Sequence, residues 1–260
     1  GAWMNTAVTR MRIHNRFQHP VAHLVCNFTP PVEGHPSLLT HNDVETLFHE
    51  FGHGLHHMLT QVDHPPIAGI NGVPWDAVEL PSQFMENWCW ERESLDLFAR
   101  HWETGEPIPA DLFERMTAAK NFQSAMAMVR QLEFSLFDFR IHRDYDPAKG
   151  GRIYEILNDV RDQVAVLKPP ASNRFAHGFS HIFAGGYAAG YYSYKWAEVL
   201  SADAFSLFEE RGIFDPDAGQ AFREQILERG GSEDAMVLYV NFRGREPTVD
   251  ALLRHTGIAA

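Results

Sequence analysis

Two histidines and a glutamate in the first quarter of the chain have the spacing of a metal-binding catalytic motif. His49, Glu50 and His53 form the pattern His-Glu-x-x-His. Within a helix, residues four apart lie on the same face, so two imidazole rings at this spacing can bind one ion. Glu50 can then reach a water molecule and act as a general base instead of binding the metal. The motif therefore predicts a site for water activation, with zinc as the expected metal.

A catalytic zinc site needs a third protein ligand beyond this pair. His56 and His57 follow on the same predicted helix, but the eighth residue after His49 lies about 12 Å further along the axis. We therefore expect both to be solvated or to lie behind the ligands, and we expect a carboxylate from elsewhere. Spacing alone leaves three candidates open in the next helical segment, namely Asp76, Glu79 and Glu86.

The elements that must position these residues are predicted to be mainly helices. Apolar residues recur at helical spacing from about 42 to 60, and Asn42 with Glu45 resembles a capping pair. The best strand candidate is 21–28, and the segment 61–75 is rich in proline and glycine, which predicts a mobile surface loop. Further helices are expected at about 77–103, 109–142, 151–168, 185–211, 217–229, 233–241 and 248–256. The expected fold is thus mainly α with a small β element.

Composition and charge exclude several classes of protein. The 260 residues are 45% hydrophobic and carry a formal net charge of −12, which argues against a nucleic-acid or anionic-membrane partner. No stretch approaches the roughly 20 apolar residues that cross a bilayer, and no signal segment is evident. The two cysteines, Cys26 and Cys89, are too few for a disulfide framework, and Cys89 between two tryptophans is expected to be buried. These features favour the cytoplasm.

Two segments around the motif carry a family resemblance. Residues 48–57 read Phe-His-Glu-Phe-Gly-His-Gly-Leu-His-His, and residues 73–83 read Val-Pro-Trp-Asp-Ala-Val-Glu-Leu-Pro-Ser-Gln. Together they resemble the thimet oligopeptidase family of zinc metallopeptidases, in particular its oligopeptidase A branch. The resemblance implies one Zn²⁺ per chain with Glu79 as the third ligand. Glu86, seven residues later on the same predicted face, either orients a zinc-bound histidine or is a solvated carboxylate.

A second segment, residues 179–194, contains three regularly spaced tyrosines. Tyr187, Tyr191 and Tyr194 stand at i, i+4 and i+7, which predicts three phenols on one helical face. By itself, such a stripe is more typical of core packing than of catalysis. In enzymes similar to this family, the tyrosine after the paired glycines stabilises the oxyanion, and this position corresponds to Tyr187. The resemblance also implies that His181 binds the substrate carbonyl and that Tyr191 and Tyr194 contact substrate.

The resemblance implies a helical zincin-type domain that acts as a zinc-dependent endopeptidase on short oligopeptides. A metal-activated water would attack the peptide carbonyl while Glu50 takes its proton. The resemblance covers essentially the whole chain, but family members are considerably longer and carry a large helical region before this part. The chain opens Gly-Ala-Trp-Met, without an initiator methionine. We therefore expect a catalytic domain over 1–260 that is a C-terminal fragment, with the missing N-terminal region as a candidate partner.

Three other interpretations stay open. A dipeptidyl carboxypeptidase of the same family would use the same zinc chemistry and would need a cationic group for the substrate's C-terminus. A ferritin-like di-iron bundle also uses Glu-x-x-His, which Glu50 and His53 satisfy once, but no other glutamate has a histidine three positions later. A non-enzyme alternative is a fragment that binds zinc and does not cleave without its upstream region.

Overall fold

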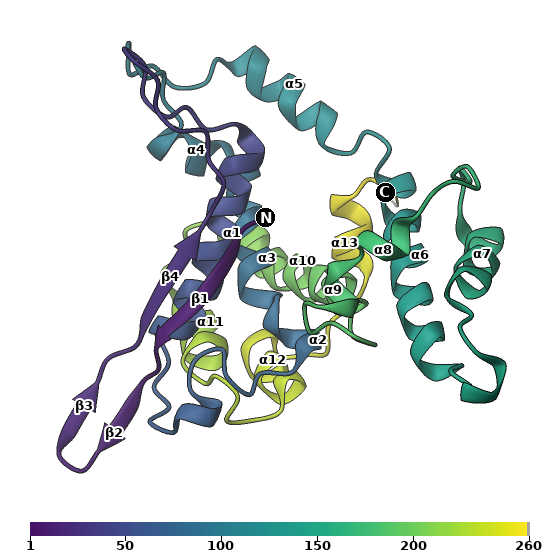
Figure 1. The fold of residues 1–260 in the computed structure, drawn as a ribbon. Helices are drawn as coiled ribbons and strands as arrows, with labels where there is room; N and C mark the ends of the chain where they lie inside the picture. Colours follow the sequence, from purple (N-terminus) through teal and green to yellow (C-terminus); the bar gives the residue numbers. More distant parts are fainter. Residues whose placement is uncertain (259–260) are drawn as a thin grey trace.

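The protein, described over residues 1–258 by a computed structural model, is mainly α-helical with two small β-ribbons (Figure 1). This confirms the predicted fold class. The strands are β1 (Trp3–Val8), β2 (Met11–Ile13), β3 (Arg16–Gln18) and β4 (Val21–Val25). The helices are α1 (His41–Met58), α2 (Trp75–Val78), α3 (Leu80–Glu86), α4 (Arg92–Phe98), α5 (Ala110–Lys120), α6 (Ser124–Arg143), α7 (Ile153–Val164), α8 (Phe175–Gly178), α9 (Ser180–Phe183), α10 (Ser193–Arg211), α11 (Pro216–Phe222), α12 (Ala235–Arg243) and α13 (Asp250–His255).

The N-terminal strands form two short antiparallel pairs, and the pair of β1 and β4 lies beside α1 (Figure 1). β1 pairs with β4 from Trp3 opposite Val25 to Val8 opposite Val21, and β2 pairs with β3 at the far end. The strand predicted over 21–28 is confirmed as β4, although it ends at Val25. The other strands were not predicted. In β1 the alternation of side chains does not follow polarity, because Trp3 is on the exposed side and Thr6 on the covered side.

The helix that carries the histidine motif forms as predicted, with a different cap. α1 begins after Thr40, whose side chain accepts from the backbone N–H of Asp43, while the Asp43 carboxylate accepts from the Thr40 backbone. This is a reciprocal capping box, which satisfies two N–H groups that a helix start leaves free. The expected capping pair, Asn42 and Glu45, lies inside the helix.

Three predicted long helices are interrupted. The segment 77–103 is divided into α2, α3, a 3-10 turn at Asn87–Trp90 and α4. Pro81 has no N–H to donate to the preceding turn, so it separates α2 from α3. The segment 109–142 breaks between α5 and α6, where Gln123 has a left-handed φ of 60°. The segment 185–211 is helical only from Ser193, and the residues before it form turns. The remaining predicted helices are confirmed as α7, α11, α12 and α13.

The segment 61–75 was expected to be a mobile surface loop, and the structure shows a loop that is tied to the rest of the chain. It contains a 3-10 turn at Pro65–Ile67, and Ala68 is fully buried. The Gln61 N–H donates to Glu228 O at 2.9 Å, and the Gly231 N–H donates to Ile67 O at 3.0 Å. The glycines and prolines therefore shape a fixed connection toward α3.

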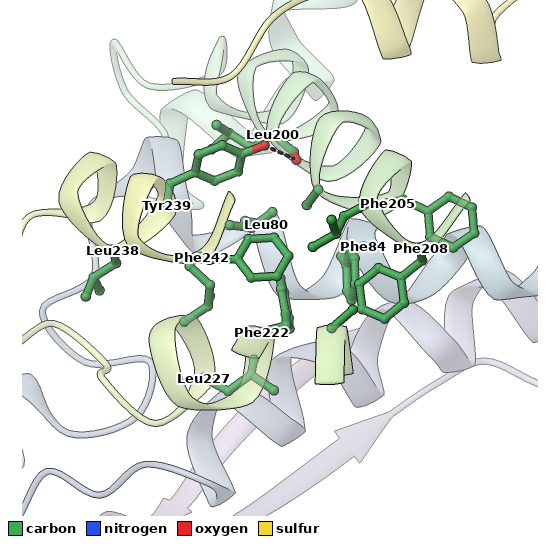
Figure 2. Close-up of a cluster of buried hydrophobic side chains, with 14 residues drawn as sticks. Leu80, Phe84, Leu200, Phe205, Phe208, Phe222, Leu227, Leu238, Tyr239 and Phe242 are labelled. Carbon is green, nitrogen blue, oxygen red and sulfur yellow. Dashed lines mark hydrogen bonds between the residues drawn. The ribbon is translucent and has the colours of Figure 1, made fainter. Parts of the chain in front are cut away.

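The main hydrophobic core lies where α3 and α10 meet the C-terminal helices (Figure 2). Phe84 of α3 is stacked on Phe222 of α11, with ring centroids 4.0 Å apart, and contacts Phe208 of α10 edge-on at 5.4 Å. A second cluster joins α6 and α7 to α8 and α9. The first core fixes the helix that follows the predicted third ligand, and the second contains buried residues of the tyrosine segment.

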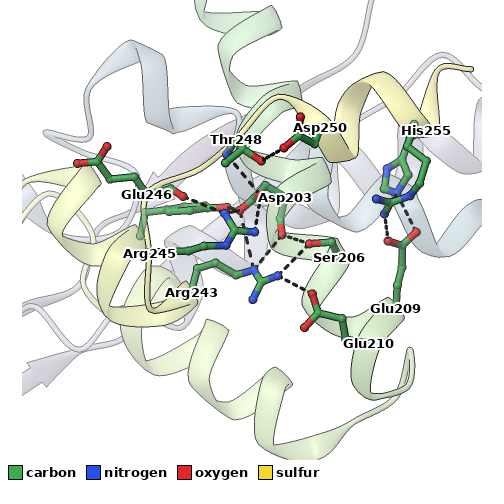
Figure 3. A network of polar contacts seen from close by, with 12 residues as sticks. Asp203, Ser206, Glu209, Glu210, Arg243, Arg245, Glu246, Thr248, Asp250 and His255 are labelled. Carbon is green, nitrogen blue, oxygen red and sulfur yellow. Dashed lines mark hydrogen bonds and ion pairs between the residues drawn. The ribbon is translucent and has the colours of Figure 1, made fainter. Parts of the chain in front are cut away.

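A polar network fixes the chain that follows α12 (Figure 3). Asp203 of α10 is almost fully buried and accepts from the Tyr239 hydroxyl at 2.5 Å. Arg245 donates to both of its carboxylate oxygens, at 3.0 Å and 2.8 Å. Buried charge requires such pairing, so this network fixes α12 and α13 on α10.

None of the helices within residues 1–258 has the length and apolar character that spanning a membrane requires.

Candidate metal centre

The helix with the histidine motif packs directly against α3 through a glycine. Gly52 lies between His49 and His53 on α1, and a Cβ atom added there would be 2.4 Å from Pro81 O and 2.6 Å from Ser82 Cα. Only a glycine therefore permits this approach of the two backbones. The contact brings the start of α3, and with it Glu79, under the histidine pair.

Three side chains converge at this contact. His53 Nε2 lies 3.1 Å from Glu79 Oε2, and His49 Nε2 lies 3.4 Å from the same oxygen. Together the three donor atoms lie within 4.8 Å of one another. Of the three carboxylates that spacing left open, the structure thus brings Glu79 to both histidines. Asp76 is not in this group, and its carboxylate lies 3.4 Å from the Tyr192 hydroxyl.

The histidines and carboxylates of this cluster shift one another's pKa values. Burial alone would lower the pKa of His49, but hydrogen bonds with Glu79 and Glu86 outweigh it and raise that pKa to about 10. Burial would raise the pKa of Glu79, but hydrogen bonds from His49 and His53 outweigh it and hold that pKa well below its ordinary value. Glu79 is therefore a carboxylate that requires positive charge beside it, which a divalent cation can supply in place of protons.

Glu79 is held at the junction between two short helices. It ends α2 and precedes the first residue of α3. The Ser82 hydroxyl donates to Glu79 Oε2 at 3.0 Å, and the Tyr187 hydroxyl donates to Glu79 Oε1 at 2.6 Å. Sequence reasoning assigned no role to Ser82, although its position three residues after Glu79 is a usable signal. Both oxygens of the carboxylate are therefore oriented by neutral donors.

Glu86 lies on the opposite side of the first histidine. Its Oε1 is 2.6 Å from His49 Nδ1, which leaves Nε2 directed at Glu79. A carboxylate on one imidazole nitrogen fixes the ring orientation and makes the other nitrogen a better ligand. Of the two interpretations given for Glu86 above, the geometry favours the one in which it orients a ligand.

Glu50 is buried beside the histidines without belonging to the ligand group. Its side chain is 4% exposed, and Oε2 makes no hydrogen bond within the described residues. Burial raises the pKa of this carboxyl above its ordinary value, which makes it a stronger base when ionised. A buried carboxylate oxygen with no protein partner is suited to hold a water molecule or a transferred proton.

The three tyrosines gather at the site, but they do not share a helical face as predicted. Tyr187 and Tyr191 lie in turns before α10, and only Tyr194 is in the helix. Tyr194 stacks on Tyr187 with centroids 4.9 Å apart, and Tyr191 packs on Tyr194 at 5.3 Å. The Tyr191 side chain is buried, and its hydroxyl donates to Gln131 Oε1 at 2.9 Å. Tertiary packing, rather than helical period, brings the phenols together.

His181 lies on the exposed side of this tyrosine cluster. Its ring centroid is 6.2 Å from that of Tyr187 and 6.0 Å from that of Tyr194. His181 is on α9, six residues before Tyr187. The structure thus groups His181 with the tyrosines, and its predicted role toward a substrate carbonyl stays a prediction.

The two histidines that follow the motif are buried, so of the two alternatives expected for them, solvated or behind the ligands, the first is wrong. His57 is fully buried, and its Nε2 lies 2.8 Å from Val8 O, so it fixes β1 on α1. His56 is 2% exposed, and burial lowers its pKa to about 3. Neither belongs to the ligand group, and His57 also lies against Gly69, where an added Cβ would be 2.6 Å from its Nδ1.

The fold and site define a class of protein: a mainly helical domain that combines a His-Glu-x-x-His helix with a carboxylate from the following helix, as metalloproteases do. The chain belongs to peptidase family M3, because the sequence model of that family matches residues 1–258.

Several named relatives are similar over the whole chain. Oligopeptidase A of Salmonella typhimurium is 60% identical over 259 residues, which cover 99% of this chain and 38% of that protein. The organellar oligopeptidase A of Arabidopsis thaliana is 50% identical over 268 residues, or 100% of this chain and 34% of the relative. A dipeptidyl carboxypeptidase of Salmonella typhimurium is 39% identical over 259 residues, with 99% and 38% covered. The chain therefore spans less than two fifths of the length of these curated relatives.

Proposed function

We propose that the chain is the catalytic part of a zinc-dependent oligopeptidase that hydrolyses internal bonds of short peptides. The observation that carries this proposal is the convergence of His49, His53 and Glu79, with buried Glu50 beside them. Membership of peptidase family M3 supports the reaction class. The higher identity to oligopeptidase A, 60% against 39% for a dipeptidyl carboxypeptidase, favours an oligopeptidase over an enzyme that releases dipeptides from the C-terminus.

The donor set fits a catalytic zinc ion. Two imidazole nitrogens and one carboxylate oxygen are the three protein ligands found in many zinc hydrolases, in which a further position stays open. Bound zinc would supply a water with a pKa lowered to about 7 and a Lewis acid for a carbonyl oxygen. We propose one Zn²⁺ per chain.

The chain's own residues would carry the proton and the developing charge. Glu50 takes a proton from water and later delivers it to the leaving amine, a role suited to a buried base. Burial and the neighbouring Glu79 raise the pKa of Tyr187, so its phenol keeps its proton and can donate. We propose that Tyr187 turns from Glu79 toward the oxyanion and that His181 assists at the substrate carbonyl.

The remaining tyrosines would hold the peptide. Tyr194 is half-buried and stacked on Tyr187, which gives a peptide an aromatic surface beside the reacting bond. Tyr191 lies behind Tyr194 with its hydroxyl on Gln131, so we propose that it contributes to peptide binding by supporting Tyr194. The partners of this site are thus short peptides, and the cytoplasm remains our expectation for where they meet it.

Removing the metal tests the proposed function. After dialysis against a chelator, we expect loss of hydrolysis of an internally quenched fluorogenic peptide and full recovery with one equivalent of zinc. Zinc at 100 times its dissociation constant should also stabilise the fold by about 2.7 kcal/mol, measured by urea unfolding. Activity that survives chelation with no bound metal would contradict the proposal.

A digest of short peptides by the zinc-loaded chain separates internal cleavage from the release of dipeptides at the C-terminus. Mass spectrometry of products should reveal fragments of several lengths, whereas release of dipeptides alone from the C-terminus would favour a dipeptidyl carboxypeptidase.

A second candidate function is zinc binding without cleavage. The observation that favours it is that the chain covers only 38% of the length of oligopeptidase A. Full zinc stoichiometry with no hydrolysis, and hydrolysis by a longer chain that carries an upstream region like that of the relatives, would establish it.

Glu86 gives a graded test of the metal site. Replacement by alanine removes the partner of His49 Nδ1 and is expected to weaken zinc affinity about 10- to 100-fold. Glu86→Gln keeps an acceptor oxygen at that nitrogen and should lose less. Competition with a fluorescent zinc chelator measures both affinities, and equal affinities in wild type and Glu86→Ala would show that the ring needs no partner.

A further inference from the structure

A fully buried carboxylate on α6 binds the backbone of the tyrosine segment. Asp138 Oδ1 accepts from the Ala189 N–H and Oδ2 accepts from the Tyr191 N–H, both at 2.9 Å. We propose that Asp138 is a positioning residue, which holds residues 187–191 so that Tyr187 reaches the metal centre. The inference rests on the proposed function for its kinetic consequence, while the anchoring itself can be measured separately.

The local conformation explains why a carboxylate is required there. Ala189 has a φ of 55°, in the left-handed region that residues with a Cβ rarely adopt. The two N–H groups on either side of Gly190 therefore point the same way, into the protein, and both need acceptors. A carboxylate can accept both at once with separate oxygens. His142 Nδ1, 3.1 Å from Oδ1, adds a third polar neighbour on the same helix.

α6 holds Tyr191 at two points. Asp138 binds its backbone, and Gln131, two turns earlier on the helix, accepts from its hydroxyl at 2.9 Å. The ring of Phe134, between them in sequence, contacts the Tyr191 ring edge-on at 5.8 Å. Tyr191 thus has a defined position relative to α6 rather than to the turns around it.

From Tyr191 the contacts continue to the ligand cluster. Tyr191 packs on Tyr194 at 5.3 Å, Tyr194 stacks on Tyr187 at 4.9 Å, and the Tyr187 hydroxyl donates to Glu79 Oε1 at 2.6 Å. A backbone shift near Ala189 would therefore move the proposed oxyanion donor. Asp138 itself makes no contact with Glu79, so its effect on the reaction would pass through the tyrosines.

The test compares two variants of buried carboxylates on α6. Asp138→Asn has one carbonyl oxygen where the wild type has two acceptors, so one of the two backbone amides faces an NH₂ group. In the zinc-loaded protein we expect at least 10-fold faster hydrogen exchange at Ala189 or Tyr191. With a fluorogenic peptide we expect a higher KM and a kcat/KM about 100-fold lower, as for a misplacement near 1 Å, with zinc content unchanged.

Glu133→Gln is the matched control. Glu133 is on the same helix and equally buried, but its partners are Arg130 and Arg161. We expect this variant to lower the melting temperature while exchange in residues 187–191 and KM stay unchanged. Should Asp138→Asn not fold, Gln131→Leu removes the second anchor of Tyr191 without removing a charge, and a smaller rise in KM with faster exchange of the segment is expected.

The outcomes separate the inference from the proposed function. Exchange and kcat/KM within twofold of wild type in Asp138→Asn, or in Gln131→Leu if the first variant does not fold, would overturn the inference. The same changes in Glu133→Gln would also overturn it, because they would reflect a general loosening of α6. If wild type hydrolyses no peptide but Asp138→Asn still shows faster hydrogen exchange at Ala189 or Tyr191, the proposed function fails and the anchoring by Asp138 stands.

Discussion

Replacing Glu50 with glutamine is expected to lower kcat for a fluorogenic peptide about 1000-fold, the middle of the range for loss of a general base. The amide is nearly isosteric but cannot accept a proton. Because Glu50 is outside the group of donor atoms formed by His49, His53 and Glu79, zinc content should stay at one per chain. Steady-state kinetics together with metal analysis of the same sample measure the effect.

A glutamate far from chemistry serves as the control for this change. Glu114 is exposed on α5, and Glu114→Gln should leave both kcat and KM within twofold of wild type. Glu50→Gln with full zinc and wild-type kcat would reject the role of base. A parallel loss of zinc would instead mean that Glu50 supports the metal.

Replacing Phe84 with alanine is expected to lower the free energy of unfolding by about 4 kcal/mol, within the range for a buried phenylalanine. Phe84 is 3% exposed at the centre of the main core, stacked on Phe222 and in edge contact with Trp88 at 4.9 Å (Figure 2). Its removal leaves a cavity that three helices border. Urea denaturation followed by circular dichroism measures the loss.

The comparison variant for this change is Phe122→Ala. Phe122 is 80% exposed between α5 and α6, so its truncation should change the free energy of unfolding by no more than about 0.5 kcal/mol. A loss below 1 kcal/mol for Phe84→Ala would mean that the core closes around the missing ring. The zinc affinity of the folded Phe84→Ala protein should be close to wild type, because the ring does not touch the ligands.

The metal motif was readable from sequence because its geometry is local. His49 and His53 are one helical turn apart, and any helix over these residues puts both rings on one face. The identity of the third carboxylate was not local: Asp76, Glu79 and Glu86 were equivalent by spacing, and a family resemblance singled out Glu79. The structure supplies the physical reason, since the break before α3 points Glu79 back toward α1.

The tyrosine segment was the least predictable part of the site. Helical spacing suggested one face, whereas the left-handed Ala189 and the acceptors on α6 produce turns that end at Ser193. An alanine carries no sequence signal for that conformation, and Asp138 is 51 residues before Ala189 in the chain. The strands β1 to β3 were missed for a similar reason, because their pairing partners, rather than their own polarity pattern, define them.

The glycine contact between α1 and α3 has a consequence for how this domain tolerates change. Side chains in a core can repack when a neighbour is altered, but two backbones in direct contact cannot adjust in this way. At Gly52 the spacing of the helices is set by main-chain atoms. Substitutions elsewhere in the core should therefore change stability while the distances among the ligand atoms stay the same, and at the contact between α1 and α3 position 52 accepts only glycine.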